Sequence, residues 1–246
     1  MGELLAKLPP KATRRDDLRI QIVGGAAPWV LVEQIRARIT KRIYNNLSST
    51  EASTIASSHL EKPGDQYWYS IYPERTVEVV DDNDQPVPAG TIGRLRIKML
   101  KDDRPIYWGD EDASKEFFKD DFWYSGDLAL FGPDGRLSLQ GRSTDVISVR
   151  GGDKIPTAPI EQDVQTALGI SGACLFATPN AKTGVDAFHL ALESPTTLDE
   201  AARKIALKKV PLRNVQIHVL DALPRNAMGK IDRIRLRQEF GLFAKE

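Results

Sequence analysis

The sequence predicts an α/β segment, a region of antiparallel β structure and a small α+β domain, in that order. Three observations support this prediction. A strand, a glycine-containing turn and a helix follow one another near the N-terminus, and short strands alternate with turns in the middle of the chain. Strands and helices then interleave over roughly the last hundred residues.

The first predicted element is a strand at residues 18–23. Leu18, Ile20 and Ile22 alternate there with polar residues, as in a half-buried strand. The turn GGAAP follows, and apolar residues then recur at four-residue intervals up to Ile43, which predicts a helix. These elements form a βα unit in whose turn the backbone can approach a ligand closely. Glycine serves a plain strand-to-helix connection equally well, so the turn alone leaves both interpretations open.

The residues from Thr76 to Gln140 follow a different pattern, in which short strands alternate with turns. The strand-like segments TVEVV and GRLRIKM lie on either side of the turn-forming stretch DDNDQPVPAG. In the same way, the turn GPDG separates YSGDLALF from RLSLQGR. This pattern predicts a compact antiparallel β region.

The last part of the chain interleaves strands and helices. The segments DVISV, ACLFAT, AFHLALE and NVQIHVL are predicted strands, and GGDKIPTAP is a predicted loop. One helix is expected where Ile160, Val164 and Leu168 share a face, and another in IDRIRLRQEF. A further helix is expected from about Thr197, which has the spacing of a capping box with Glu200.

The composition excludes several classes of function. Lysine plus arginine and aspartate plus glutamate both number 34, so no net charge favours nucleic acid or an anionic membrane surface. No apolar run approaches membrane-spanning length, and the N-terminus lacks a signal-peptide pattern. We therefore expect no nucleic-acid partner and no membrane partner.

The cysteine and two of the histidines, His189 and His218, are interpreted as structural residues. The single cysteine, Cys174, lies in an apolar run, as a small buried hydrophobe would, and it fits a reducing, cytoplasmic location. The histidines His59, His189 and His218 are far apart in the sequence, and none has a second ligand at metal-binding spacing. His189 and His218 lie in strand-like runs.

Thr50 and Glu51 form the first of three stretches in which polar groups lie on predicted loops. A hydroxyl beside a carboxylate on one turn suits a hard cation such as Mg²⁺ with its attached phosphate. Thr followed by Glu is also common at a helix N-cap, and these two residues alone favour that alternative.

The second and third stretches carry an aspartate and an arginine. In WYSGDL, Asp127 stands between a glycine and an apolar segment, so its carboxylate is expected at the start of a strand. A carboxylate there can accept two hydrogen bonds from a vicinal diol such as ribose. The stretch GRSTDVISVRGGDKIPTAPIE, residues 141–161, places Arg142 before a strand and a Gly-Gly loop. Turn chemistry explains each feature equally well when it is taken singly.

Lys230 lies in the stretch LPRNAMGKIDR, where Pro224, Asn226 and Gly229 predict a loop. Taken alone, it is a solvated lysine beside the last helix. In order along the chain, however, GGAAP, STE, YSGDL, GRSTDVISVRGGDKI and PRNAMGKIDR resemble the C-terminal half of the adenylate-forming superfamily. This superfamily contains AMP-dependent acyl- and aryl-CoA synthetases, firefly luciferase and peptide-synthetase adenylation domains.

The resemblance implies two domains. Residues 1–142 would be the C-terminal part of the large AMP-binding domain, and 143–246 the small mobile C-terminal domain, with a hinge near 143–146. The hinge falls on Thr144 or Asp145, and we favour Asp145 because a charged residue can be solvated in both domain positions.

The resemblance also implies AMP-forming activation of a small carboxylic acid, with ATP, Mg²⁺ and coenzyme A as cofactors and co-substrate. An acyl-adenylate would form first, and the acyl group would then pass to coenzyme A. The implied catalytic residues are Lys230, Glu51 and Thr50, with Glu51 also as the Mg²⁺ ligand. The residues implied to bind nucleotide or coenzyme A are Ala26, Ala27, Pro28 and Leu47 at adenine, Asp127 and Arg142 at ribose, and Gly152 at pantetheine.

Two departures from the family pattern bear on activity and on adenine binding. No glycine-rich phosphate loop precedes GGAAP, so we expect the isolated chain to be inactive, and Leu47 stands where the family has an aromatic residue against adenine. Three alternatives stay open: a non-catalytic remnant that binds nucleotide or protein, one half of a split synthetase, and an adenylation domain that loads a carrier protein. The partners considered are a complementing N-terminal half and a second copy of the chain.

Overall fold

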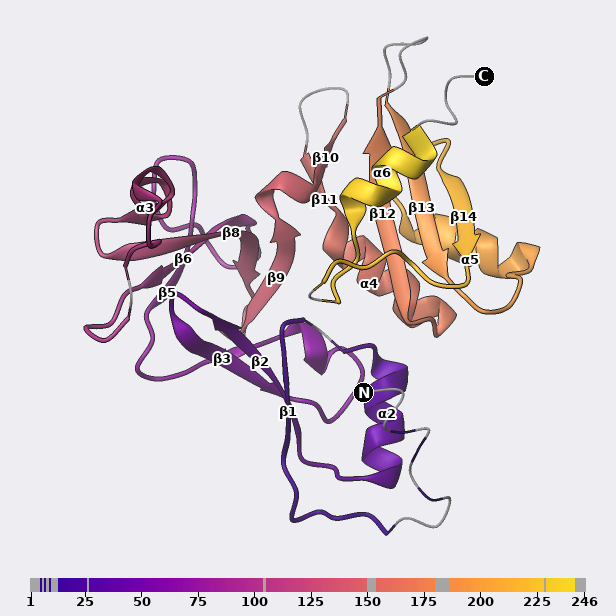
Figure 1. Ribbon diagram of the computed structural model, residues 1–246, viewed down its shortest axis with the longest axis horizontal. Coiled ribbons are helices and arrows are strands. Elements are labelled where there is room, and N and C mark those ends of the chain that lie inside the picture. Colours follow the sequence, from indigo (N-terminus) through magenta and orange to yellow (C-terminus); the bar gives the residue numbers. More distant parts are fainter. Residues whose placement is uncertain are drawn as a thin grey trace. The chain divides into compact units, whose positions relative to one another are not determined.

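The chain divides into two compact units, Met1–Thr144 and Asp145–Glu246. The computed structural model in Figure 1 describes residues 5, 7, 9, 13–25, 27–103, 105–149, 154–179, 186–227 and 229–241. None of the helices that these residues form is both long and apolar enough to cross a membrane.

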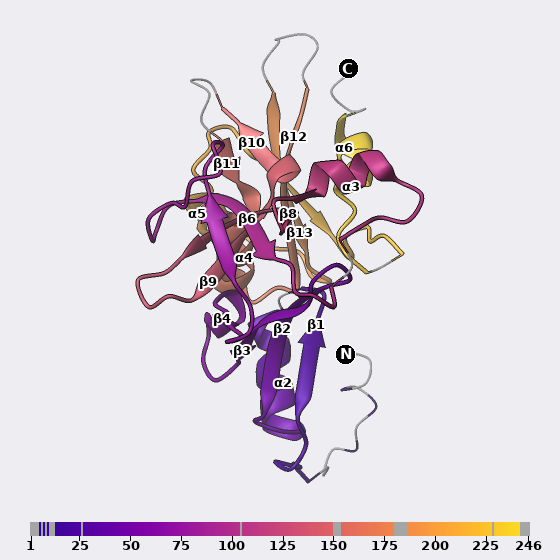
Figure 2. The same cartoon turned by 90° about the vertical axis from the view of Figure 1, so that its left-hand side faces the viewer.

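The first unit begins with a four-stranded sheet in the order β1-β2-β3-β4. Its elements are β1 (Ile20–Val23), α2 (Trp29–Arg38), β2 (Ile43–Ser49), β3 (Ser53–His59), a 3₁₀ turn η1 (Asp65–Tyr67) and β4 (Ser70–Ile71). β1 and β2 are parallel, and α2 connects them and packs against them, so the predicted βα unit is present (Figure 2).

The predicted helix is shorter than its apolar spacing suggested. Helix α2 ends at Arg38, and Ile43 instead begins β2, where it pairs with Ile20 of β1. Ile43 keeps the four-residue spacing because it is fully buried in the same apolar cluster as Val32 and Ile35. Burial in one apolar cluster therefore gives Ile43 the spacing of a helix position although it belongs to a strand.

A second, five-stranded antiparallel sheet completes the first unit, with strand order β5-β6-β8-β7 and β9 paired with β8. Its strands are β5 (Val77–Val80), β6 (Gly93–Lys98), β7 (Phe118–Lys119), β8 (Phe122–Phe131) and β9 (Leu137–Arg142), and helix α3 (Glu111–Phe117) precedes β7. One core cluster joins this sheet to β3 through Ile55, Leu95 and Leu137. The predicted antiparallel region is confirmed, although α3 within it was not predicted.

The described residues of the second unit form a hairpin, a three-stranded sheet and three helices. Its elements are β10 (Val146–Ser148), β11 (Lys154–Pro156), α4 (Thr157–Leu168), β12 (Gly172–Thr178), β13 (Ala187–Glu193), α5 (Glu200–Lys209), β14 (Gln216–Leu220) and α6 (Arg233–Gly241). β12 and β13 are antiparallel, whereas β13 and β14 are parallel and are joined through α5.

Alternation along the strands gives the three-stranded sheet of the second unit two buried faces. Leu175 and Leu190 point to the side covered by α4 and α5, whereas Cys174 and Phe176 point to the side covered by α6 (Figure 1). Because both faces are covered, these strands are continuous apolar runs in the sequence. Cys174 is fully buried, and burial raises the pKa of its thiol to about 12.

Two predictions for the second unit were wrong in detail. Helix α5 begins at Glu200, and its N-cap is Asp199, whose side chain accepts a hydrogen bond from the Ala202 N–H at 2.8 Å; Thr197 forms no capping box. The predicted loop GGDKIPTAP contains β11 and the first turn of α4. β11 is only three residues long and forms by pairing with β10. Its sequence is too short to show the alternation of apolar and polar residues that would predict a strand.

Candidate functional site

Thr50 and Glu51 form the turn of the β2–β3 hairpin in the first unit. Ser53 closes the turn in the left-handed region at φ 51°, and the Ala52 N–H donates to the Ser49 Oγ at 2.9 Å. The hairpin excludes the helix N-cap that the sequence favoured here. Thr50 is exposed and Glu51 is half-buried, so both side chains are displayed on a turn that the hairpin holds in place.

Glu51 is anchored by a tyrosine that the sequence did not single out. The Tyr107 hydroxyl donates to the Glu51 Oε1 at 2.8 Å and accepts from the Trp123 Nε1–H at 3.3 Å. Burial raises the pKa of Tyr107, the Trp123 N–H lowers it and the Glu51 carboxylate raises it, with a net upward shift. Arg142 also lies close enough for its charge to lower the Tyr107 pKa.

Asp127 and Arg142 are direct neighbours on adjacent strands of the second sheet. Arg142 Nε lies 3.1 Å from Asp127 Oδ1, and Arg142 Nη1 donates to the Ser125 carbonyl at 2.5 Å. The Asp127 backbone N–H donates to the Ser125 Oγ at 3.1 Å. These contacts hold the aspartate and the arginine together.

The position of Asp127 within its strand differs from the prediction. β8 begins at Phe122, so Asp127 lies inside the strand rather than at its start. The ladders on both sides of β8 shift register near this point, and Gly126 adopts φ 75°. A register shift of this kind re-aims a side chain, and Gly126 supplies the backbone angle that an L-residue avoids.

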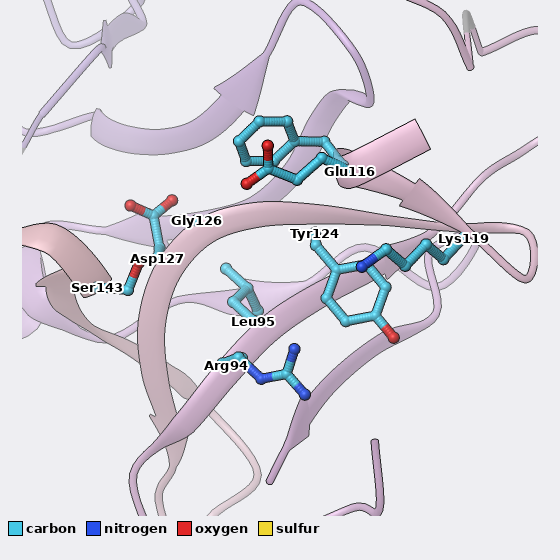
Figure 3. Close-up of a pocket in the computed structure, with 9 residues that line it drawn as sticks. Arg94, Leu95, Glu116, Lys119, Tyr124, Gly126, Asp127 and Ser143 are labelled. Carbon is cyan, nitrogen blue, oxygen red and sulfur yellow. The ribbon is translucent and has the colours of Figure 1, made fainter. Parts of the chain in front are cut away.

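Asp127 borders a pocket of about 180 Å³ in the first unit (Figure 3). Its lining residues are Arg94, Leu95, Glu116, Phe117, Lys119, Tyr124, Gly126, Asp127 and Ser143. In Figure 3 Asp127 and Ser143 lie at one end, and Tyr124 and Lys119 at the other. The pocket is therefore lined by two carboxylates, Asp127 and Glu116, and by the basic side chains of Arg94 and Lys119.

The Tyr124 end of this pocket is fixed by its own polar network. Tyr124 donates to the Asp84 Oδ1 at 2.8 Å and accepts from Arg96 Nη1 at 2.9 Å, and Arg94 Nη2 donates to the same Asp84 oxygen at 2.9 Å. Tyr124, Arg94 and Asp84 are therefore held by one another within the first unit.

The residues expected near adenine lie on the first sheet and at the start of α2. Ala27 is buried in the core, and Pro28 is the N-cap residue of α2. Leu47, in β2, is half-buried against the core at the point where the β2–β3 register shifts. Ala26 and Gly152 lie outside the described residues.

Lys230 belongs to the second unit, where it is exposed on a loop before α6. The loop is closed by hydrogen bonds from the Asn226 N–H to the Lys230 carbonyl at 2.8 Å and from the Lys230 N–H to the Asn226 Oδ1 at 3.1 Å. Gly229 provides the left-handed turn at φ 78°. The backbone of Lys230 is therefore held while its ammonium group stays at the surface.

Arg233, three residues after Lys230, forms a buried network that the sequence did not reveal. Its Nη2 lies 2.7 Å from Glu161 Oε2, and its Nε lies 3.3 Å from Asp145 Oδ2. Glu161 Oε1 also accepts the Leu175 N–H at 2.7 Å. Burial alone would lower the pKa of Arg233, but the two carboxylates raise it, and the net shift is upward. The network ties the start of α6 to α4 and to the expected hinge residue.

His189 and His218, which are far apart in the sequence, are in contact in the folded second unit. His189 Nδ1 lies 3.0 Å from His218 Nε2, and His189 Nε2 lies 2.8 Å from Thr178 Oγ1. Phe240 stacks on His218 with ring centroids 4.0 Å apart. Burial, together with the charge of His218, lowers the pKa of His189 to about 4. The described side chains contain no group of three or more His, Cys, Asp or Glu that could hold a metal, and this pair is a packed structural contact.

Comparisons with known proteins identify the family. No protein-family model matches the chain. The chain is 28% identical to enterobactin synthase component E of Escherichia coli over 228 residues, which are 89% of this chain and 42% of that protein. It is 32% identical to the long-chain-fatty-acid–CoA ligase of Salmonella typhimurium over 178 residues, which are 68% of this chain and 30% of that protein.

The fold is similar to that of solved ligases. A benzoate CoA ligase from Burkholderia xenovorans LB400 matches 96% of this chain and 49% of its own length, with a TM-score of 0.76 and 23% sequence identity. The chain thus spans less than half the length of each of these three proteins. With the ordered motifs and the shared fold, these relatives show that the chain belongs to the adenylate-forming superfamily of AMP-dependent synthetases and ligases.

Proposed function

We propose that this chain binds the adenine nucleotide in the AMP-forming activation of a small carboxylic acid. The observation that supports this most directly is the link between two candidate groups in the first unit. Trp123 of β8, the strand that also contains Asp127, donates to the Tyr107 hydroxyl, and this hydroxyl is bonded to Glu51. The carboxylates proposed to bind ribose and Mg²⁺ are therefore linked through β8 and Tyr107.

In this proposal Asp127 accepts hydrogen bonds from the ribose hydroxyls. Arg142 orients the carboxylate, because its guanidinium bonds both to Asp127 and to the neighbouring Ser125 carbonyl. The backbone around Ala26, Ala27 and Pro28, together with the Leu47 side chain, would contact adenine. Leu47 offers an apolar surface without the stacking of an aromatic ring.

The Thr50–Glu51 turn fits a magnesium ion with its phosphate. Oxygen ligands are what Mg²⁺ prefers, and it is usually bound through one or two carboxylates together with substrate phosphates. Tyr107 engages Oε1 of Glu51, and no hydrogen bond among the described residues reaches Oε2. Glu51 would hold the ion through this oxygen and Thr50 would donate to a phosphate oxygen. When bound, Mg²⁺ would stabilise the charge on the phosphate oxygens.

Lys230 is the proposed catalytic cation of the second unit. Attack of a carboxylate on the α-phosphate brings two anions together, and an ammonium group that offsets the developing charge lowers the barrier. We also propose that a hinge at Thr144 or Asp145 moves the second unit between the adenylation and thioester steps. Gly152 would border the pantetheine of coenzyme A in the second step.

The binding proposal is tested by calorimetric titration of the 246-residue chain with AMP and with 2′,3′-dideoxy-AMP. We expect AMP to bind and the dideoxy analogue to bind about 10–100-fold more weakly, since a hydrogen bond to a charged group contributes roughly 1.5–3 kcal/mol. Equal affinity for the two compounds would show that the nucleotide is not recognised through its diol. No binding of either would favour a remnant with another partner.

The reaction is tested by acid-dependent exchange of pyrophosphate into ATP. We expect no exchange with the chain alone and exchange when an N-terminal half with a phosphate loop is added. Thioester formation with coenzyme A then distinguishes a CoA ligase from a domain that loads a carrier protein. An antibody against the second unit would show whether the protein in its cells has this chain's 27.4 kDa or about twice that mass. Detection in the cytosolic fraction would support the proposed cytoplasmic location.

A further inference from the structure

Tyr107 lies at the meeting point of three separate elements of the first unit. Its backbone belongs to the segment before α3, its hydroxyl donates to Glu51 on the β2–β3 turn at 2.8 Å, and it accepts from Trp123 of β8 at 3.3 Å. The tyrosine is 56 positions from Glu51 in the sequence, so only the fold brings them together.

Ring packing and backbone hydrogen bonds hold Tyr107 in place. Its ring packs against Phe117, with centroids 6.1 Å apart and an edge-on angle of 81°, and against Phe118 at 5.3 Å. Its backbone N–H donates to the Ser114 Oγ at 2.8 Å, and its carbonyl accepts from the Asp110 N–H at 3.1 Å. The hydroxyl is therefore fixed in position before any ligand binds.

Glu51 lacks such support of its own. It lies half-buried on the β2–β3 turn, and a glutamate loses side-chain entropy when it is held in one conformation. Tyr107 provides that restraint through one carboxylate oxygen and leaves the second without a hydrogen bond among the described residues. Carboxylates that bind metals are themselves commonly hydrogen-bonded, and loss of the supporting partner typically lowers metal affinity about 10–100-fold.

We propose that Tyr107 is the positioning residue of the Glu51 carboxylate and that, through Glu51, it sets the Mg²⁺ affinity of the nucleotide complex. This inference rests on the proposed function. Tyr107 itself touches neither metal nor nucleotide in this role. Its contribution is the O–H donor, whereas its ring supports the local packing.

The variant Tyr107→Phe removes the donor and keeps the ring. Calorimetric titrations of the chain with ATP over a series of Mg²⁺ concentrations give the Mg²⁺ midpoint of ATP binding. We expect this midpoint to rise about 10–100-fold in Tyr107→Phe, with ATP binding in the absence of Mg²⁺ unchanged. The control is Tyr69→Phe, which removes a phenol that accepts from Asn45 at 2.8 Å and makes no contact with Glu51.

A double-mutant cycle separates positioning from a general loss of structure. If Tyr107 acts through Glu51, Glu51→Gln and the double variant with Tyr107→Phe have the same Mg²⁺ midpoint. Additive effects would overturn the inference, as would a Tyr107→Phe midpoint equal to that of Tyr69→Phe, and both results leave the proposed function standing. ATP binding that shows no Mg²⁺ dependence in the unmodified chain would overturn the inference together with the Mg²⁺ role proposed for Glu51, whereas no binding of ATP at all would reject the proposed function.

Discussion

Asp127 and Arg142 face each other across the β8–β9 ladder, with Oδ1 of the aspartate 3.1 Å from Nε of the arginine. The aspartate side chain is 21% exposed and the arginine 53%, so the pair lies at the surface of the unit and is reachable by a ligand. A ligand that engages Asp127 therefore meets a carboxylate whose orientation is already set by Arg142.

Replacement of Asp127 by Asn should weaken AMP binding by about 10–100-fold, because a neutral amide replaces a charged acceptor. The same change should leave binding of 2′,3′-dideoxy-AMP nearly unaffected. Calorimetric titration measures both. The matched control is Asp134→Asn in the same hairpin, where Asp134 pairs with Arg136 at 2.7 Å at the surface. Equal losses of affinity for AMP and for 2′,3′-dideoxy-AMP would show that Asp127 does not bind the ribose hydroxyls.

Lys230→Ala should slow acyl-adenylate formation by about 10²–10³-fold, the usual effect of removing one charge-stabilising group from a transition state. The rate is measured as pyrophosphate exchange after the chain is combined with an N-terminal half. Lys204→Ala is the control, since Lys204 is an exposed lysine of the same unit that pairs with Glu200 at 2.7 Å. A rate loss shared by both variants would argue against a specific catalytic role for Lys230.

Arg233→Met should destabilise the second unit by about 3–5 kcal/mol, because it leaves the buried Glu161 carboxylate without its partner. The Glu161 side chain is only 8% exposed. Arg235→Met, on the same helix, breaks an exposed pair with Glu239 and should cost at most about 1 kcal/mol. Urea unfolding followed by far-ultraviolet circular dichroism gives the two values. A cost for Arg233→Met as small as that for Arg235→Met would mean that Glu161 is readily solvated.

The second unit should lose stability as the pH falls from about 6.5 toward 4. Burial lowers the folded-state pKa of His189 from 6.5 to about 4 and also lowers that of His218. Between pH 6.5 and 4 the unfolded chain therefore binds protons that the folded unit does not bind. Above pH 6.5 both states are neutral and the pair has no effect on pH dependence. His189→Gln should flatten the dependence.

The tryptophans provide an internal control for this pH prediction. All four, Trp29, Trp68, Trp108 and Trp123, lie in the first unit, so their fluorescence follows that unit while circular dichroism also reports the second. A pH dependence that is identical in His189→Gln and in the unmodified chain would attribute the loss to other groups.

Local sequence patterns predicted most of the strands because their physical signals are local. The strands that contain Cys174, His189 and His218 are apolar runs, and the turns between β8 and β9 carry glycine and proline. The errors arose where tertiary contacts replaced local rules. Ile43 continued a helical period although it pairs with Ile20 in a sheet, and Asp199 rather than Thr197 caps α5.

In the candidate site, too, some features follow from the sequence and others only from tertiary contacts. The types and order of Thr50, Glu51, Asp127, Arg142 and Lys230 are properties of the sequence, and they were sufficient to indicate the family. The sequence alone thus determined the superfamily and the chemistry to be tested.

The partners of these residues were decided by the tertiary structure. Tyr107 reaches Glu51 across 56 positions, and Arg233 reaches Glu161 across 72. Side chains so distant in the sequence leave no periodic or spacing signal, because they become neighbours only when strands pair and helices pack. The fold therefore decided how each candidate carboxylate is held, and that support is what the proposed experiments measure.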